Sequence, residues 1–355
     1  MTAGTGVGMR MAGAGQAPFV IAEMSGNHNG SLERALAIVD AAARAGAHAL
    51  KLQTYTADTM TLDLDRGEFR IDDGASLWHG QTLHELYARA HTPWDWHAAL
   101  FERARGHGLV AFSTPFDASA VDFLERLGAP CYKVASFENV DLALIRRVAA
   151  TGKPVIISTG LATLDEIGEA VAAAREAGCR ELVLLKCTSA YPASPEHSHL
   201  AGIAELRRRF GCAVGVSDHT PGIGAALAAV ALGASVVEKH FTLARADGGV
   251  DAAFSLEPAE LRALVEESHR AWQAVGEVRF GPTAAERPML AFRRSLYVTR
   301  DLAPGDVLSA DNLRAIRPGL GLPPKHLPAL LGRRVATRVA RGTPMSWALV
   351  EGGGP

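Results

Sequence analysis

The chain has 355 residues, 48% of them apolar and 21% charged, with a formal net charge of −2. This composition is ordinary for a soluble globular protein, and the small net charge gives no support for nucleic acid or an anionic membrane as a partner. No apolar run approaches the ~20 residues of a membrane span. The four cysteines form no CxxC pair, so we expect buried free thiols and a cytoplasmic location.

The N-terminal part predicts a leader and a first strand–helix unit. Residues 1–18 are rich in Gly and Ala but lack the apolar core of a signal peptide, so we expect a disordered leader. A strand over 19–22 ends at Glu23, and Ser31 can cap the helix that follows. A second strand, over 48–53, again ends in polar side chains.

A long connection, from about Tyr55 to Pro93, separates the second strand from the next helix. It carries several aromatic residues, including Trp78 and Tyr87, with Trp94 directly after it. A connection of this length inside a compact domain usually serves as a lid or a binding loop. The alternative is that its aromatic side chains pack the segment onto the rest of the domain.

The alternation of strand and helix patterns then becomes regular. Strand-like runs that end in polar residues occur at 109–112, 131–135, 155–157, 182–185, 213–216 and 236–241. Eight strand–helix units up to about Gly276 fit the ~250 residues of a (β/α)8 TIM barrel. An open doubly wound sheet also alternates, but its polar strand ends would concentrate at one switch point. Because polar residues end every strand here, the pattern favours a closed barrel over residues 19–280.

Two consecutive strands end in a histidine beside a carboxylate. The first is followed by Ser217-Asp218-His219, and the second ends in Glu238-Lys239-His240. Two neutral imidazoles at neighbouring strand ends can bind one cation. Local hydrogen bonding of each imidazole is the alternative interpretation.

The pattern of the sequence changes after Gly281-Pro282, where the regular alternation of strands and helices ends. Residues 281–292 are typical of a linker, and residues 293–355 combine short strand patterns with Pro-Gly turns and one short helical piece after Ser309. A domain of this size is marginally stable alone and is expected to dock on another surface. Most of its arginines suit a solvated surface, but Arg317 lies in a Pro/Gly-rich loop that can carry it into a neighbouring site.

The predicted strand ends converge on one mouth of the barrel. Two lysines among several serines make a site for phosphate or carboxylate oxygens, although Lys51 and Lys133 can also pair with Glu23 or Glu238. No nucleotide-binding glycine motif is present. The residues expected at the mouth are Glu23, Lys51, Gln53, Thr114, Lys133, Ser136, Ser158, Ser189, Ser217, Asp218, His219, Glu238, Lys239 and His240.

These residues belong to ordered motifs that together resemble the sialic acid synthase family. The resemblance runs from about Phe19 to the C-terminus, and the final domain is similar to the antifreeze-like (SAF) domain of that family. The motifs are Ile21-Ala22-Glu23, Asn27-His28-Asn29-Gly30, Lys51-Leu52-Gln53, Tyr132-Lys133-Val134-Ala135-Ser136, Ser158-Thr159-Gly160, Cys187-Thr188-Ser189-Ala190-Tyr191-Pro192, Ser217-Asp218-His219 and Glu238-Lys239-His240-Phe241.

The resemblance implies a phosphoenolpyruvate-dependent transferase. In the implied reaction, the enol carbon of phosphoenolpyruvate attacks the aldehyde of an open-chain N-acyl sugar. Water adds at C2 of phosphoenolpyruvate, and phosphate leaves with C–O cleavage. A divalent metal, usually Mn²⁺ with Mg²⁺ or Co²⁺ as alternatives, polarises the aldehyde. The family also implies a homodimer in which each SAF domain caps the partner barrel, with Arg317 reaching the sugar.

The resemblance assigns roles residue by residue. His219 and His240 are the metal ligands, and Glu23 manages protons or stabilises charge at C2. At Ser189 many relatives have Asn. The phosphoenolpyruvate set is Lys51, Lys133, Ser136, Ser158, Ser189 and Ser217, and the sugar set is Gln53, Tyr191, Asp251 and Arg317.

Three stretches are similar to the pseudaminic acid synthase branch of this family: 22–32, 76–94 and 248–258. This implies a 2,4-diacetamido-2,4,6-trideoxy-L-altrose substrate, and Met24 with the Trp78 segment is expected to suit its apolar 6-methyl group. An N-acetylneuraminate or legionaminate synthase shares the core motifs and is the alternative. A metal-dependent pyruvate aldolase is disfavoured by the lysine–serine set. A non-catalytic carbohydrate- or ice-binding protein is disfavoured because no flat Thr-rich face is evident.

Overall fold

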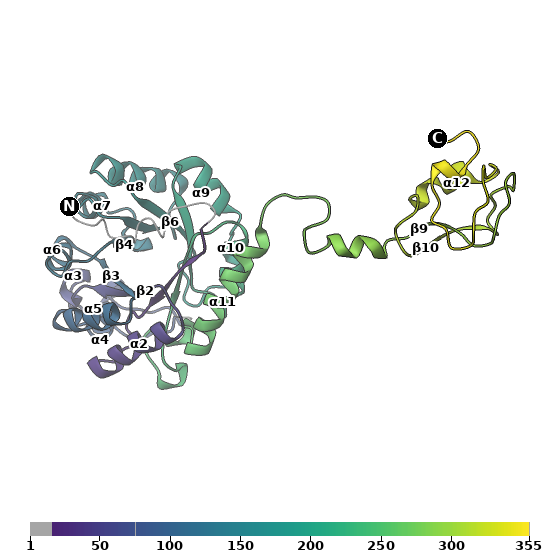
Figure 1. Ribbon diagram of the computed structural model, residues 1–355. Coiled ribbons are helices and arrows are strands. Elements are labelled where there is room, and N and C mark those ends of the chain that lie inside the picture. The colour runs from purple at the N-terminus through teal and green to yellow at the C-terminus, as the bar shows by residue number, and fades with distance from the viewer. Residues whose placement is uncertain (1–15, 75, 355) are drawn as a thin grey trace. The chain divides into compact units, whose positions relative to one another are not determined.

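The computed structural model describes residues 16–74 and 76–354 and divides into two compact units at Gly276/Glu277. Residues 1–15 of the predicted leader lie outside the described residues. The first unit is a closed barrel of eight parallel strands with helices around it (Figure 1), which confirms the predicted TIM barrel. Within the described ranges, no helix is both long and apolar enough to cross a membrane.

The eight strands follow chain order around the barrel, and β1 closes it by pairing in parallel with both β2 and β8. The strands are β1 (Phe19–Glu23), β2 (Ala49–Thr54), β3 (Val110–Pro115), β4 (Tyr132–Val134), β5 (Val155–Ser158), β6 (Leu182–Cys187), β7 (Ala213–Asp218) and β8 (Val236–His240).

The helices begin at residues that satisfy their free backbone N–H groups. Ser31 caps the first one, as the sequence predicts, and Thr163 forms a capping box with Glu166. The helices are α2 (Leu32–Arg44), α3 (Ala57–Met60), α4 (Leu83–Ala90), α5 (His97–Gly106), α6 (Ala118–Arg126), α7 (Leu142–Ala149), α8 (Leu164–Glu176), α9 (Gly202–Phe210), α10 (Gly224–Ala231) and α11 (Pro258–Val275).

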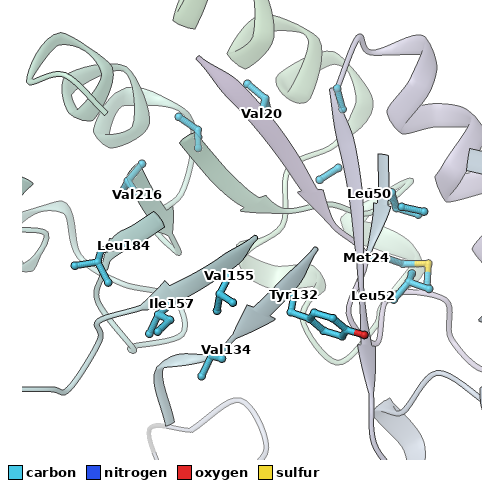
Figure 2. Close-up of a cluster of buried hydrophobic side chains, with 14 of the residues drawn as sticks. Val20, Met24, Leu50, Leu52, Tyr132, Val134, Val155, Ile157, Leu184 and Val216 are labelled. Atoms are coloured by element: carbon cyan, nitrogen blue, oxygen red, sulfur yellow. The ribbon is translucent and has the colours of Figure 1, made fainter. Parts of the chain in front are cut away.

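Alternate residues of each strand serve two different cores. One set packs against the helices, as Val20, Leu50, Val134 and Ile157 do in Figure 2. The other set points into the barrel and fills its lower part with apolar side chains: Phe19, Ile21, Ala49, Phe112, Cys131, Ile156, Val183, Leu185 and Val236. This alternation decides which strand-end residues can reach the mouth.

The long connection between β2 and α5 is attached to the domain at two different places. Trp94 packs on the barrel, where its Nε1 donates to Tyr55 O at 3.1 Å and its ring lies 4.7 Å from the Phe123 ring. Trp78 instead extends toward the loop after β8 and donates from Nε1 to Val250 O at 2.9 Å. Part of the connection is therefore structural, and part is tied across to the loop after the last strand.

The second unit is a small β-rich domain with its own apolar core. Strands β9 (Ser295–Val298) and β10 (Leu313–Ile316) pair antiparallel, and isolated bridges join the remaining segments. The expected helical piece after Ser309 is a turn. The short helix α12 lies instead at Leu327–Leu330, where Pro328 falls in the first turn and needs no N–H partner. The core consists of Leu296, Val298, Leu302, Leu308, Leu313, Leu330, Val335, Val339, Met345 and Val350.

Candidate active site

The interior of the barrel changes from apolar to polar toward the C-terminal ends of its strands. Glu23, Lys51, Lys133, Ser158 and Glu238 occupy inward positions two residues beyond the apolar layer, and all are at least 95% buried. Burial of so many ionisable groups is costly unless they are paired or await a ligand. The upper interior is therefore the place where chemistry is expected.

Two lysines share two carboxylates there. Lys51 Nζ lies 2.8 Å from Glu23 Oε2 and 3.7 Å from Glu238 Oε1, and Lys133 Nζ lies 3.7 Å from the same Glu238 oxygen. Ser217 Oγ donates to that oxygen as well, at 3.1 Å. The ion pairing that the sequence allows is present, and it holds both ammonium groups at one point of the mouth.

The protein environment shifts the pKa values of the Glu23 and Glu238 carboxyl groups in opposite directions. Burial raises the pKa of Glu23 above its ordinary range, against the effect of the nearby Lys51 ammonium. Burial acts in the same direction on Glu238, but Lys133 and Lys51 together bring the pKa of Glu238 below its ordinary value. Glu238 thus supplies the countercharge for both lysines, and Glu23 is the carboxyl group better suited to hold a proton.

The serines gather around Gly160, just after β5. A Cβ atom on Gly160 would lie 2.3 Å from Ser189 Oγ and 2.7 Å from Ser136 Oγ, and Gly160 N donates to Ser136 Oγ at 3.1 Å. Ser158 Oγ is buried without a hydrogen-bond partner. The absence of a side chain at Gly160 lets two hydroxyls converge, and the unpartnered hydroxyl of Ser158 remains available to an anion.

The imidazole rings of His219 and His240 lie next to each other, and the aromatic rings of Tyr191 and Phe254 lie beside them. The centroids of the two imidazole rings are 5.3 Å apart, and Tyr191 lies 4.4 Å from His219 while Phe254 lies 4.9 Å from His240. His219 Nδ1 lies 2.9 Å from Thr188 O and His240 Nδ1 lies 3.2 Å from Ser25 Oγ. Both Nδ1 atoms are thereby occupied, which leaves the Nε2 atoms for another partner.

This arrangement fits a divalent cation held by two imidazoles. A metal-bound histidine characteristically donates its second N–H to a carbonyl or polar side chain, and the Nδ1 atom of each ring here lies within hydrogen-bond distance of such a group. Burial keeps the pKa of His240 well below its ordinary value, so the ring is neutral and able to ligate. In the described part of the chain no three His, Cys, Asp or Glu side chains are grouped for a metal.

The sugar-binding candidates lie in different places. Gln53 Nε2 donates to Glu23 Oε1 at 2.9 Å, and Asp251 Oδ2 lies 3.8 Å from His240 Nδ1, so both are at the mouth. Tyr191 makes tilted ring contacts with His219 and with Trp78, whose ring centroid is 6.0 Å from that of Tyr191. Arg317 directly follows β10 in the second unit.

Three expectations at the strand ends are wrong. Asp218 and Lys239 occupy outward positions and pair with each other at 3.1 Å, away from the mouth. Met24 is fully buried among the residues that pack against the helices (Figure 2), so it cannot line a sugar site. Alternate side chains along a strand point to opposite faces, and each of these three points toward the helices and not into the barrel. The spacing of the motifs alone does not reveal which face a residue takes.

Two carboxylates at the mouth have more contacts than their motifs predict. Glu238 is expected at the mouth without a catalytic or binding role, and it contacts both lysines. Glu138, in the turn after β4, is largely buried, and burial raises its pKa to about 7 despite Lys133 nearby. Its position two residues after Ser136, just beyond a strand end, is the signal that could have found it.

Comparison with known proteins supports one family. The NeuB family description matches residues 38–280, and the SAF domain matches residues 293–351. A pseudaminic acid synthase of Campylobacter jejuni serotype O:23/36 is 42% identical over 324 residues, 91% of this chain and 94% of that protein. A pseudaminic acid synthase of Helicobacter pylori is 41% identical over 333 residues, 93% and 97% of the two chains.

A solved structure agrees with these matches. The N-acetylneuraminic acid synthetase of Leptospira borgpetersenii, in complex with citrate, superposes with a TM-score of 0.69 at 32% identity, covering 78% of this chain and 91% of that one. The family match covers more than half of the residues, and relatives above 40% identity span nearly the whole length. The chain belongs to the NeuB family.

Proposed function

We propose that this protein is a pseudaminic acid synthase. It condenses phosphoenolpyruvate with 2,4-diacetamido-2,4,6-trideoxy-L-altrose and water to give pseudaminate and phosphate. The observation that carries the proposal is the convergence of two buried lysines, a serine cluster and two imidazoles at one barrel mouth. Relatives that bear the name pseudaminic acid synthase at 41–42% identity support the choice of sugar.

The anionic substrate is assigned to the lysine–serine side of the mouth. The Lys51 and Lys133 ammonium groups supply positive charge, and the hydroxyls of Ser136, Ser158 and Ser189 supply oriented donors for phosphate and carboxylate oxygens. Ser158 suits this role because its hydroxyl has no protein partner. Ligand binding would compensate charges and donors that are already buried.

The reaction breaks one bond of phosphoenolpyruvate and forms two. C3 bonds to the aldehyde carbon of the sugar, the oxygen of water bonds to C2, and the C2–O bond to phosphate breaks with the electron pair leaving on phosphate. Of the two protons of water, one ends on the former aldehyde oxygen and one on phosphate, so C2 becomes the keto carbon of the product. Glu23 lies beside Lys51 with a raised pKa, which suits a group that stabilises charge at C2 or transfers a proton there.

The metal assigned to His219 and His240 is Mn²⁺, with Mg²⁺ or Co²⁺ as alternatives. A bound divalent cation would polarise the aldehyde oxygen as a Lewis acid. The two residues hold their Nδ1 atoms against Thr188 O and Ser25 Oγ, which presents the Nε2 atoms for ligation.

The working form is proposed to be a homodimer whose SAF domain caps the partner's barrel and delivers Arg317 to the sugar. Two observations support an external cap. The mouth rim exposes Phe137 and Leu161 at 58% and 70%, and the SAF unit exposes Leu320 at 72% close to Arg317. The four free thiols support the cytosol as the compartment.

Phosphate release from phosphoenolpyruvate tests this function. The purified protein is loaded with Mn²⁺ and assayed with the trideoxy sugar, N-acetylmannosamine and the legionaminate precursor, each with and without chelator. Chelator-sensitive release confined to the trideoxy sugar is the expected result. Release with another sugar would keep the reaction and replace the substrate, whereas no release from folded, metal-loaded protein would overturn the synthase assignment.

A further inference from the structure

Ser25 adopts a backbone conformation that is uncommon for its residue type. It lies in the turn directly after Glu23, with φ at 43°, in the left-handed region that glycine favours. Its side chain is 1% exposed. A strained, buried, polar residue beside a candidate active site calls for an explanation in terms of what its side chain does.

The Ser25 hydroxyl lies between an imidazole and a carboxylate. Its Oγ is 3.2 Å from His240 Nδ1, and the Asp251 carboxylate lies beside them, with Oδ2 3.8 Å from the same Nδ1 atom. A hydroxyl has one proton, and we assign it to the Asp251 carboxylate, so that the Ser25 oxygen accepts from Nδ1–H of His240. This order fixes the tautomer of His240 with its lone pair on Nε2.

Both sides of this relay are anchored to the barrel. Met24 N donates to Lys51 O at 3.1 Å, which fixes the turn that carries Ser25. Ser255 Oγ donates to Asp251 O at 2.7 Å, and Asn27 Nδ2 donates to Ser255 Oγ at 2.8 Å. The loop after β1 and the loop after β8 are thus joined around the hydroxyl.

We propose that Ser25 is a positioning residue for His240 and that Asp251 acts on His240 through it. The inference rests on the proposed function, because it takes His240 as a metal ligand. Glycine would adopt this φ with less strain than serine. The presence of serine therefore indicates that its hydroxyl has a role that offsets the conformational cost. Its gain is an oriented imidazole, the arrangement that raises the affinity of a histidine for a cation.

The variants Ser25→Gly and Ser25→Ala separate this role from a structural one. Both remove the hydroxyl, but only the glycine variant also relieves the left-handed strain, so it should unfold no more easily than the parent. Mn²⁺ affinity is measured on the substrate-free protein by electron paramagnetic resonance of free Mn²⁺. We expect the Kd of both variants to rise about 10-fold or more.

Ser268→Ala is the matched control, because Ser268 is a fully buried serine on α11 with no hydrogen-bond partner for its hydroxyl. It should leave the Kd unchanged. The double variant Ser25→Gly/Asp251→Asn should weaken binding no further than the stronger single variant. An unchanged Kd in Ser25→Gly, or fully additive effects with Asp251→Asn, would overturn the proposal.

The outcomes distinguish this inference from the proposed function. If the parent protein binds Mn²⁺ through His240 but releases no phosphate with any sugar, the synthase assignment fails and the positioning role stands. If His240→Gln leaves the Kd for Mn²⁺ unchanged, His240 is not a ligand and the positioning role fails. With an active parent, the expected kinetic signature of Ser25→Gly is a lower kcat with little change in KM for phosphoenolpyruvate.

Discussion

Lys239 and Asp218 form a buried ion pair directly behind the two histidines. The Nζ–Oδ2 distance is 3.1 Å, and both side chains are at most 2% exposed. Lys239 Nζ also donates to Thr220 O, and Asp218 Oδ1 accepts from Thr220 N at 2.9 Å. Since His240 and His219 are the next residues along the chain, the pair joins the two imidazole-bearing segments from the side opposite the mouth.

Replacing Lys239 by Met should therefore strongly destabilise the barrel. The change leaves the Asp218 carboxylate buried without its cation, a situation that typically costs about 3–5 kcal/mol. The free energy of unfolding is measured by urea denaturation. The double variant Asp218→Asn/Lys239→Met should recover a substantial part of the loss, and a single variant as stable as the parent would contradict this account.

Replacing Lys133 by Met should weaken phosphoenolpyruvate binding. One charge-assisted hydrogen bond to an anion is worth about 1.5–3 kcal/mol, so KM should rise roughly 10- to 100-fold. Lys186→Met is the matched control, because Lys186 lies on the outward face of β6 and donates to Cys187 O at 3.2 Å. Equal increases in KM for both variants would argue against Lys133 as a substrate ligand.

Adding one methyl group at Gly160 should block the serine cluster while leaving the fold intact. The backbone φ at Gly160 is not positive, so alanine is tolerated conformationally, but its Cβ would clash with Ser189 Oγ and Ser136 Oγ. Gly160→Ala is expected to lower kcat/KM for phosphoenolpyruvate by at least about 10-fold, in line with the cost of overpacking. Thermal unfolding checks that the fold is retained, and normal activity would show that the hydroxyls need not converge.

Acid should destabilise the protein between about pH 6.5 and pH 4 through two buried histidines. Burial lowers the pKa of both His97 and His28 to about 4. The unfolded chain therefore binds more protons than the folded chain in this window, and stability falls as the pH falls. His97 Nδ1 lies 3.1 Å from Pro93 O and donates to it, and Nε2 of the neutral ring can accept from Thr54 Oγ1 at 2.8 Å.

His97→Gln should flatten the pH dependence of the unfolding free energy by about 2–3 kcal/mol between those limits. The measurement is a series of urea titrations across the window. His79→Gln, at an exposed position, is the matched control and should keep the parent slope. A parent-like slope in His97→Gln would show that His97 does not cause the acid sensitivity.

Trp78 is expected to contribute to sugar choice. Its ring lies 6.0 Å from Tyr191, which in turn lies 4.4 Å from His219, so it stands two ring contacts from the metal candidates. Trp78→Ala should lower kcat/KM for the trideoxy sugar by about 10- to 100-fold and change KM for phosphoenolpyruvate much less. The neighbouring exposed Leu77→Ala is the control, and an unchanged kcat/KM for the sugar in Trp78→Ala would leave Trp78 without a role in sugar choice.

Periodicity and strand-end chemistry were sufficient to predict the barrel and to bring Lys51, Lys133 and the two histidines to one mouth. The sequence predicted less well which individual side chains point into the barrel and which point toward the helices. Asp218 and Lys239 look as reactive as their neighbours, but a strand turns every second side chain toward the helices. Met24 fails for the same reason, since it continues the outward face of β1.

Ser25 illustrates a second limit of the sequence. Its contact with His240 spans 215 positions of the chain and depends on a left-handed backbone that no local preference of serine predicts. The separate behaviour of Glu23 and Glu238 likewise depends on which of them touches both lysines. Such differences arise from packing between segments that are distant in the chain, so residue order alone does not predict them.

The alternation of β8 also restricts how the chain can vary in length. Deleting one residue before Glu238 would turn Lys239 into the barrel and send Glu238 and His240 toward the helices. Insertions and deletions are thus excluded from the strands that carry the reaction, but not from loops such as 61–82 and 244–255. A lineage could therefore acquire a new sugar preference by lengthening or shortening a loop. The residue spacing within the strands that carry the catalytic side chains would then be inherited unchanged.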